Sequence, residues 1–148
     1  MTSVLFVCTG NTCRSPIAEA LLKHMDNQQV EVRSAGVYAH SGDEASRYAQ
    51  EVLNDHHIAH HHSARLLSRE DMEWADYVLA MTQSHRNAIM HAFPQYTGKV
   101  FTLKEFVGGE YDSMDVMDPF GGTKQHYQGT FMELKELIGK LVEKLGGH

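Results

Sequence analysis

The most constraining feature of this chain is a loop of eight residues, 8–15, that lies between an apolar run and a helix-like run. Residues 4–7 are four consecutive apolar side chains, and Pro16 begins a stretch rich in alanine and leucine. Proline is well tolerated in the first turn of a helix, because the N–H that it lacks would have no partner there. The loop is therefore expected to connect a buried strand to a helix, as in parallel βαβ folds.

The same loop has the composition of an anion-binding site. A helix N-terminus offers unpaired N–H groups and partial positive charge, and consecutive N–H groups form a concave nest for an anion. Gly10 permits a tight turn, and the planar guanidinium of Arg14 can bind two phosphate oxygens at once. Cys8 places a thiol where these positive surroundings favour the thiolate form. The sequence thus predicts a phosphate-binding loop with a cysteine nucleophile.

Strand-like and helix-like segments alternate along the rest of the chain. After the first strand at 3–7, strands are expected at 30–34, 77–81 and 100–103, and helices at 16–25, 43–53, 83–93 and 127–145. Ser68 and Asp71 have the spacing of a capping box for a further short helix. The Gly- and Asp-rich stretch 104–126 is expected to reach the Cys8 loop, because parallel strands share one carboxyl edge.

Inside that stretch, one acidic residue is the candidate proton donor. Pro119 biases Asp118 towards an extended conformation, and Gly121 and Gly122 permit a sharp bend after it. Asp118 could therefore be held above a bound phosphate. Asp112 and Asp115 lie in the same stretch, and we interpret them as solvated loop carboxylates rather than as a second proton donor, since only Asp118 precedes proline.

Composition narrows the class of protein. A length of 148 residues with 42% hydrophobic residues fits one domain, 1–148, with a single core. The net charge of -6 argues against a nucleic-acid partner, and the chain has neither a signal-like leader nor a membrane-length apolar run. We therefore expect a cytoplasmic protein without a membrane partner. The two cysteines share one loop, which suits reactive thiols better than a disulfide framework or structural zinc.

These residues resemble a known family. The segment 8–15 resembles the C-x-G-N-x-C-R-S signature of the low-molecular-weight protein tyrosine phosphatases, and Asp118-Pro119 resembles their late D-P motif. The segment Arg33-Ser34-Ala35-Gly36, the chain length and the order of elements also agree. The resemblance implies a three-layer α/β/α domain with a four-stranded parallel sheet in the order 2-1-3-4 and the phosphate-binding loop after the first strand.

The resemblance also implies a mechanism that the residue chemistry supports. Cys8 would attack phosphorus, Arg14 would bind the transition state, and Asp118 would protonate the leaving group and later activate water. No metal or other cofactor is expected. The expected substrate-binding residues are those of the loop and one aromatic residue after the acid: Thr9, Gly10, Asn11, Thr12, Cys13, Ser15 and Phe120.

Two positions depart from the tyrosine-specific members of the family. Thr12 stands where many of them carry a bulky aliphatic residue, and Phe120-Gly121 stands where they carry an aromatic pair. This pattern resembles the protein arginine phosphatase branch. A hydroxyl tolerates a planar polar leaving group, the Asp118 carboxylate can pair with a guanidinium, and Phe120 can stack on it. We therefore predict phosphoarginine on proteins as the substrate, with a tyrosine phosphatase as the alternative, and we expect a monomer.

Other interpretations stay open at this stage. Cys13 is either a resolving thiol that forms a disulfide with oxidised Cys8 or simply a small buried residue. Five of the seven residues 56–62 are histidine, and we interpret this run as a solvated loop rather than as a metal site. An arsenate reductase of the same fold would need further cysteines, whereas a phosphate-binding module without catalysis would need no Asp118.

Overall fold

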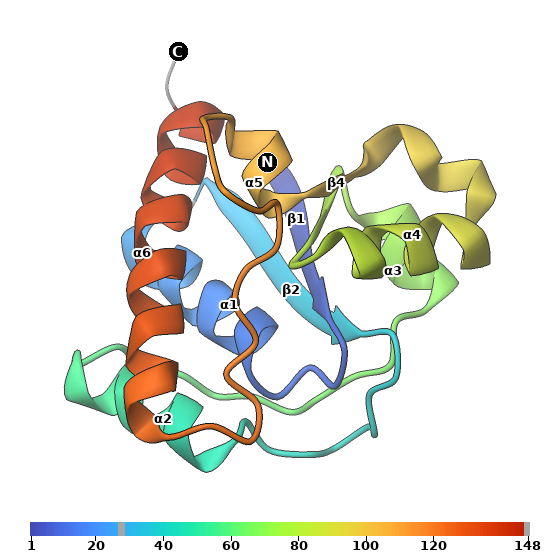
Figure 1. Ribbon diagram of the computed structural model, residues 1–148. Helices are drawn as coiled ribbons and strands as arrows, with labels where there is room; N and C mark the ends of the chain where they lie inside the picture. Colours follow the sequence, from blue (N-terminus) through green and yellow to red (C-terminus); the bar gives the residue numbers. More distant parts are fainter. Residues whose placement is uncertain (27–28, 147–148) are drawn as a thin grey trace.

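The computed structural model describes residues 1–26 and 29–146 and consists of one parallel sheet between two layers of helices (Figure 1). The strands are β1 (Thr2–Cys8), β2 (Val30–Gly36), β3 (Tyr77–Ala80) and β4 (Val100–Thr102). They are all parallel and lie in the order β2-β1-β3-β4. The predicted fold class and strand order are therefore confirmed.

Alternate side chains of β1 enter two separate cores. Val4 and Phe6 pack with residues of α1 (Arg14–Met25), α2 (Arg47–Asp55), α5 (Leu103–Val107) and α6 (Lys124–Gly146). Leu5 and Val7 pack on the opposite face with residues of α3 (Arg69–Trp74) and α4 (Gln83–Ala92). Figure 1 shows α1 and α6 on one side of the sheet and α3 and α4 on the other. A 3₁₀ helix, η1 (Pro94–Lys99), connects α4 to β4.

The long helix α6 packs as its periodicity predicts. Its apolar stripe is fully buried at Phe131, Leu134, Ile138 and Leu141. Burial of each such side chain stabilises the fold by about 1.5–3 kcal/mol relative to leaving it in water. The capping box at the start of α3 is also present, with Ser68 Oγ accepting a hydrogen bond from the backbone N–H of Asp71.

Two predicted boundaries were wrong. The second helix begins at Arg47 rather than near Asp43, because the backbones of Gly42 and Asp43 bond to Ala64 and so leave the helical path. The stretch after β4 was expected to be a loop, but it begins with α5, which starts with a capping box between Thr102 and Glu105.

Within the described residues, no helix combines the length and the apolar character needed to cross a membrane.

Candidate active site

A pocket of about 190 Å³ lies where the Cys8 loop leaves the sheet and meets the Asp118 loop. Six of its eight lining residues lie in the segment 8–14, from the last residue of β1 to the first of α1, and the other two follow α5 by more than ten residues. The lining residues are Cys8, Thr9, Gly10, Thr12, Cys13, Arg14, Asp118 and Phe120. The structure thus brings together the three predicted catalytic residues. Of the predicted substrate-binding residues, Asn11 and Ser15 lie outside this lining and are fully buried.

Cys8 and its neighbours form a hydrogen-bonded chain that leads into the protein. Sγ of Cys8 lies 2.9 Å from Oγ of Ser15, and Nδ2 of Asn11 donates to the same Oγ at 2.8 Å. Because Ser15 Oγ already accepts from Asn11, the hydroxyl hydrogen of Ser15 is free to point at the sulfur. Ser15 can therefore stabilise negative charge on Cys8.

Asn11 ties the loop to two distant segments. Its Nδ2 also donates to Oγ of Ser34 at 2.9 Å, and its Oδ1 accepts from the backbone N–H of Arg65 at 2.9 Å. Its backbone has a φ of 58°, in the left-handed region that asparagine adopts more readily than most residues. The bonds from Ser34 and Arg65 offset the cost of that conformation and hold the turn of the loop.

A glycine permits the close packing beneath this loop. Gly36 ends β2 directly opposite Cys8, and a Cβ added there would lie 2.5 Å from the carbonyl oxygen of Thr9 and 2.9 Å from the backbone nitrogen of Asn11. No real Cβ tolerates such distances. The backbone of the anion-binding loop can therefore rest on the edge of the sheet only because residue 36 lacks a side chain.

The interpretation of the histidine run as a solvated loop was wrong for one of its members, His62. Nε2 of His62 donates to the backbone carbonyl of Asn11, and the His62 side chain is only 9% exposed. His56 is exposed, as that interpretation expects, and its ring also stacks on Phe131 with centroids 4.2 Å apart. Within the described residues, no three His, Cys, Asp or Glu side chains lie close enough to hold a metal ion.

Arg14 connects the two halves of the pocket. It is 5% exposed; its Nη1 donates to the carbonyl of Val116 at 3.1 Å, and its Nη2 lies 3.5 Å from Oδ2 of Asp118. The Asp118 side chain is 54% exposed, and its Oδ1 accepts from the backbone N–H of Phe120 at 3.0 Å. The guanidinium is thus fixed by the protein, whereas the carboxylate stays accessible to a ligand in the pocket.

His85 supports the pocket from α4. Its Nε2 lies 2.7 Å from Oγ1 of Thr9, and its Nδ1 has no hydrogen-bond partner among the described residues. Burial, and then the positive charge of Arg14, lower the pKa of His85 to about 4, although Asp118 and Asp115 act in the opposite direction. His85 is therefore neutral at pH 7 and adds no second positive charge beside Arg14.

Cys13 lies at the inner wall of the pocket, and neither it nor Cys8 is in a disulfide. Its Sγ is 3.3 Å from the hydroxyl of Tyr127 and 3.6 Å from Oγ of Ser46. Burial, together with the bond to Cys13, raises the pKa of Tyr127 to about 12.

Asp115, expected to be a solvated loop carboxylate, is exposed but accepts a bond from the backbone N–H of Gln83 at the start of α4.

Sequence reasoning missed His62, His85 and Tyr127 because each reaches the site from a remote segment. His85 and Tyr127 lie at the starts of the expected helices 83–93 and 127–145, which was a weak signal, whereas His62 lies between expected elements and gave none. Phe120 and Thr12 both line the pocket, and Phe120 is 70% exposed.

Known proteins resemble this chain over nearly its whole length. A family model described as low molecular weight phosphotyrosine protein phosphatase matches residues 3–148. The chain is 49% identical over 142 residues to a protein-arginine-phosphatase of Geobacillus stearothermophilus, covering 96% of this chain and 95% of that protein. It is 41% identical over 141 residues to the low molecular weight protein-tyrosine-phosphatase PtpB of Staphylococcus aureus, covering 95% of this chain and 96% of that protein. A solved cysteine-to-serine mutant of the YwlE arginine phosphatase, with a phosphorylated active-site serine, has a TM-score of 0.94 at 47% identity and covers 99% of this chain and 97% of that one.

Proposed function

The chain belongs to the low molecular weight phosphotyrosine protein phosphatase family, and we propose that it hydrolyses phosphoarginine on proteins. It is a cysteine-dependent protein phosphatase whose substrates are phosphorylated proteins. The observation that carries the proposal is the pocket itself, in which Cys8, Arg14, Asp118 and Thr12 line one space of about 190 Å³.

In the first step, Cys8 takes the phosphoryl group. Sγ attacks phosphorus while the N–P bond to the guanidinium of the substrate breaks, and Asp118 gives its proton to the leaving nitrogen. The loop N–H groups and Arg14 meet the negative charge that spreads over the three equatorial oxygens. Support for a covalent intermediate comes from the phosphorylated serine that replaces cysteine in the YwlE arginine phosphatase mutant.

In the second step, water attacks the phosphocysteine. Asp118, now a carboxylate, takes a proton from the water, the S–P bond breaks, and phosphate leaves. The hydroxyl of Ser15, 2.9 Å from Sγ, can stabilise the departing thiolate. These steps use groups of this chain alone, and each group returns to its starting protonation state.

Substrate choice would depend on the pocket wall. The Thr12 hydroxyl offers a hydrogen-bonding surface where a bulky aliphatic side chain would favour a phenol ring, and the exposed ring of Phe120 is free to stack on a guanidinium. Once Asp118 has given up its proton, its carboxylate can pair with the guanidinium that leaves. The 49% identity to a protein-arginine-phosphatase supports this choice, and the 41% identity to PtpB supports phosphotyrosine as the alternative.

The test compares kcat/KM on phosphoarginine and phosphotyrosine peptides of the same sequence. We expect the wild type to prefer phosphoarginine and Thr12→Ile to lose that preference by about tenfold or more, since a polar group left without its hydrogen-bond partner costs about 1–3 kcal/mol. The control is Thr97→Ile, the same substitution in η1, outside the pocket. An equal preference in wild type and Thr12→Ile would remove Thr12 as the determinant, and a wild type that prefers phosphotyrosine would favour the alternative.

The cytoplasmic location and the monomeric state remain predictions. Gel filtration with light scattering would test the second directly: a single species of about the chain mass of 16.7 kDa is expected, whereas a stable dimer would contradict it.

A further inference from the structure

The loop that carries Asp118 is fastened by a buried lysine that comes from outside the pocket. Lys104, in α5, has a side chain that is only 7% exposed. Its Nζ donates to the carbonyl oxygen of Ser113 at 3.1 Å and to that of Asp115 at 2.9 Å. One ammonium group therefore gathers two backbone carbonyls from the segment that directly precedes the acid.

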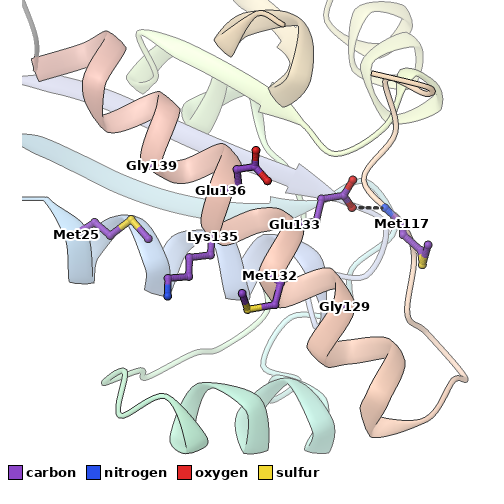
Figure 2. Close-up of a pocket in the computed structure, with 8 residues that line it drawn as sticks. All are labelled: Met25, Met117, Gly129, Met132, Glu133, Lys135, Glu136 and Gly139. Atoms are coloured by element: carbon purple, nitrogen blue, oxygen red, sulfur yellow. Dashed lines mark hydrogen bonds between the residues drawn. The ribbon is translucent and has the colours of Figure 1, made fainter. Parts of the chain in front are cut away.

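The same ammonium is paired with a carboxylate that holds the next residue of the loop. Oε2 of Glu133, in α6, lies 2.8 Å from Nζ of Lys104, and Oε1 of Glu133 accepts from the backbone N–H of Met117 at 3.1 Å. Figure 2 shows this second bond at the edge of a groove of about 830 Å³ along α6. Met117 directly precedes Asp118 in the chain. The Lys104–Glu133 ion pair therefore holds the backbone one residue before the acid.

Other bonds leave the segment little freedom except at the acid itself. The backbone N–H of Val116 donates to Met81 in the sheet region, and Thr130 Oγ1 donates to the carbonyl of Met117. The Asp118 side chain, by contrast, is 54% exposed, with its Oδ2 only 3.5 Å from Arg14. The position of the carboxylate above the pocket is thus set by where Met117 is held.

We propose that Lys104 and Glu133 form a positioning pair for the general acid: together they fix residues 113–117, and so they set the reach of Asp118 to the leaving group. Neither side chain touches the substrate. This inference rests on the proposed role of Asp118 as proton donor, and it concerns only the geometry of proton transfer.

A proton transfer is more sensitive to such positioning than the rest of the reaction. The donor must come within hydrogen-bond reach of the leaving atom, and a misplacement of about 1 Å can cost about 100-fold in rate. Nucleophilic attack by Cys8 depends instead on the loop between β1 and α1, which Lys104 and Glu133 do not touch. The carbonyl of Val116, which holds Arg14, lies in the fastened segment, but the N–H of Val116 is separately bonded to the carbonyl of Met81. Loss of the pair should therefore weaken acid catalysis and leave attack on an activated substrate nearly intact.

The experiment measures kcat/KM on two aryl phosphates that differ in leaving group. Phenyl phosphate expels a basic phenolate that needs a proton, whereas 2,4-dinitrophenyl phosphate expels a stable anion that does not. We expect Lys104→Met and Glu133→Gln to lower kcat/KM on phenyl phosphate by about 10- to 100-fold and on the dinitrophenyl ester by less than about threefold. In an Asp118→Asn background, the same substitutions should cause little further loss, because the group that they position is gone.

The control is Glu136→Gln, since Glu136 lies one helical turn further along the same groove and does not hold Met117 (Figure 2). This variant should have the wild-type kcat/KM on both aryl phosphates. Equal losses on the two esters in Lys104→Met and Glu133→Gln, or a loss that persists in the Asp118→Asn background, would overturn the positioning role. If Lys104→Met does not fold, Glu133→Gln alone decides the question. If Asp118→Asn itself shows no selective loss on phenyl phosphate, the proposed acid fails rather than its positioning.

Discussion

The neutral histidine beneath the pocket makes a measurable prediction about stability. The pKa of His85 is about 4 in the folded protein against an ordinary value of 6.5, because the ring is buried and lies near Arg14. The unfolded chain therefore binds more protons than the folded chain between pH 6.5 and 4, and the folded state loses stability as the pH falls through this window. In total, the free energy of unfolding decreases by about 3 kcal/mol across this window, and about 2 kcal/mol of that decrease occurs between pH 7 and pH 5.

Urea denaturation at pH 7 and pH 5 measures this loss when wild type is compared with His85→Gln. The other ten histidines are common to both proteins, so the difference between their two losses belongs to His85. We expect the variant to lose about 2 kcal/mol less than the wild type between these pH values. His91→Gln, a change at an exposed histidine of the same helix, should keep the full loss because it leaves the surroundings of His85 intact. An equal loss in wild type and His85→Gln would refute a neutral buried His85.

Two further predictions concern the loop. Gly36→Ala would press a methyl group against the backbone of Thr9 and Asn11 and should lower kcat/KM by about 100-fold or more. The control is Gly98→Ala, whose added methyl group meets nothing within 4 Å and should leave kcat/KM unchanged. Wild-type activity in Gly36→Ala would contradict the close contact. If Cys13 resolves oxidised Cys8, peroxide-treated wild type should recover activity with dithiothreitol while Cys13→Ser should recover little of it, and equal recovery would favour Cys13 as a packing residue only.

Much of the fold was predictable because its signals are local. Four apolar runs and the period of the last helix were sufficient for the parallel sheet and for the buried stripe of α6. The start of α2 was not predictable, because Asp43 has the local features of a helix start but its backbone bonds to Ala64, which is remote in sequence. Helix α5 was missed because its five residues are too few to show a period.

The functional site, too, contains residues that local sequence patterns predicted and residues that they did not. Cys8, Arg14 and the other loop residues lie within eight positions, so their proximity follows from the sequence, and Asp118 could be added because the strands are parallel. His62 offered no such signal: it lies in a run of histidines that has the composition of a solvated loop, yet it donates to Asn11. A hydrogen bond between residues 51 positions apart depends on the path of the chain, which no local pattern specifies.

The bonds beneath the loop bear on how the pocket works. Asn11 is held in the left-handed region by groups from β2 and from the segment that precedes α3, and its carbonyl is held by His62. All of these bonds join groups of the protein itself, so they hold the loop in a shape in which its N–H groups can meet an anion. Fixed donors of this kind need no reorganisation when charge develops on a phosphoryl group, and this preorganisation is the larger part of what such a site contributes to the rate. On the proposed mechanism, the buried network under Cys8 would therefore act on the transition state through geometry alone, since none of Ser34, Arg65 and His62 lines the pocket.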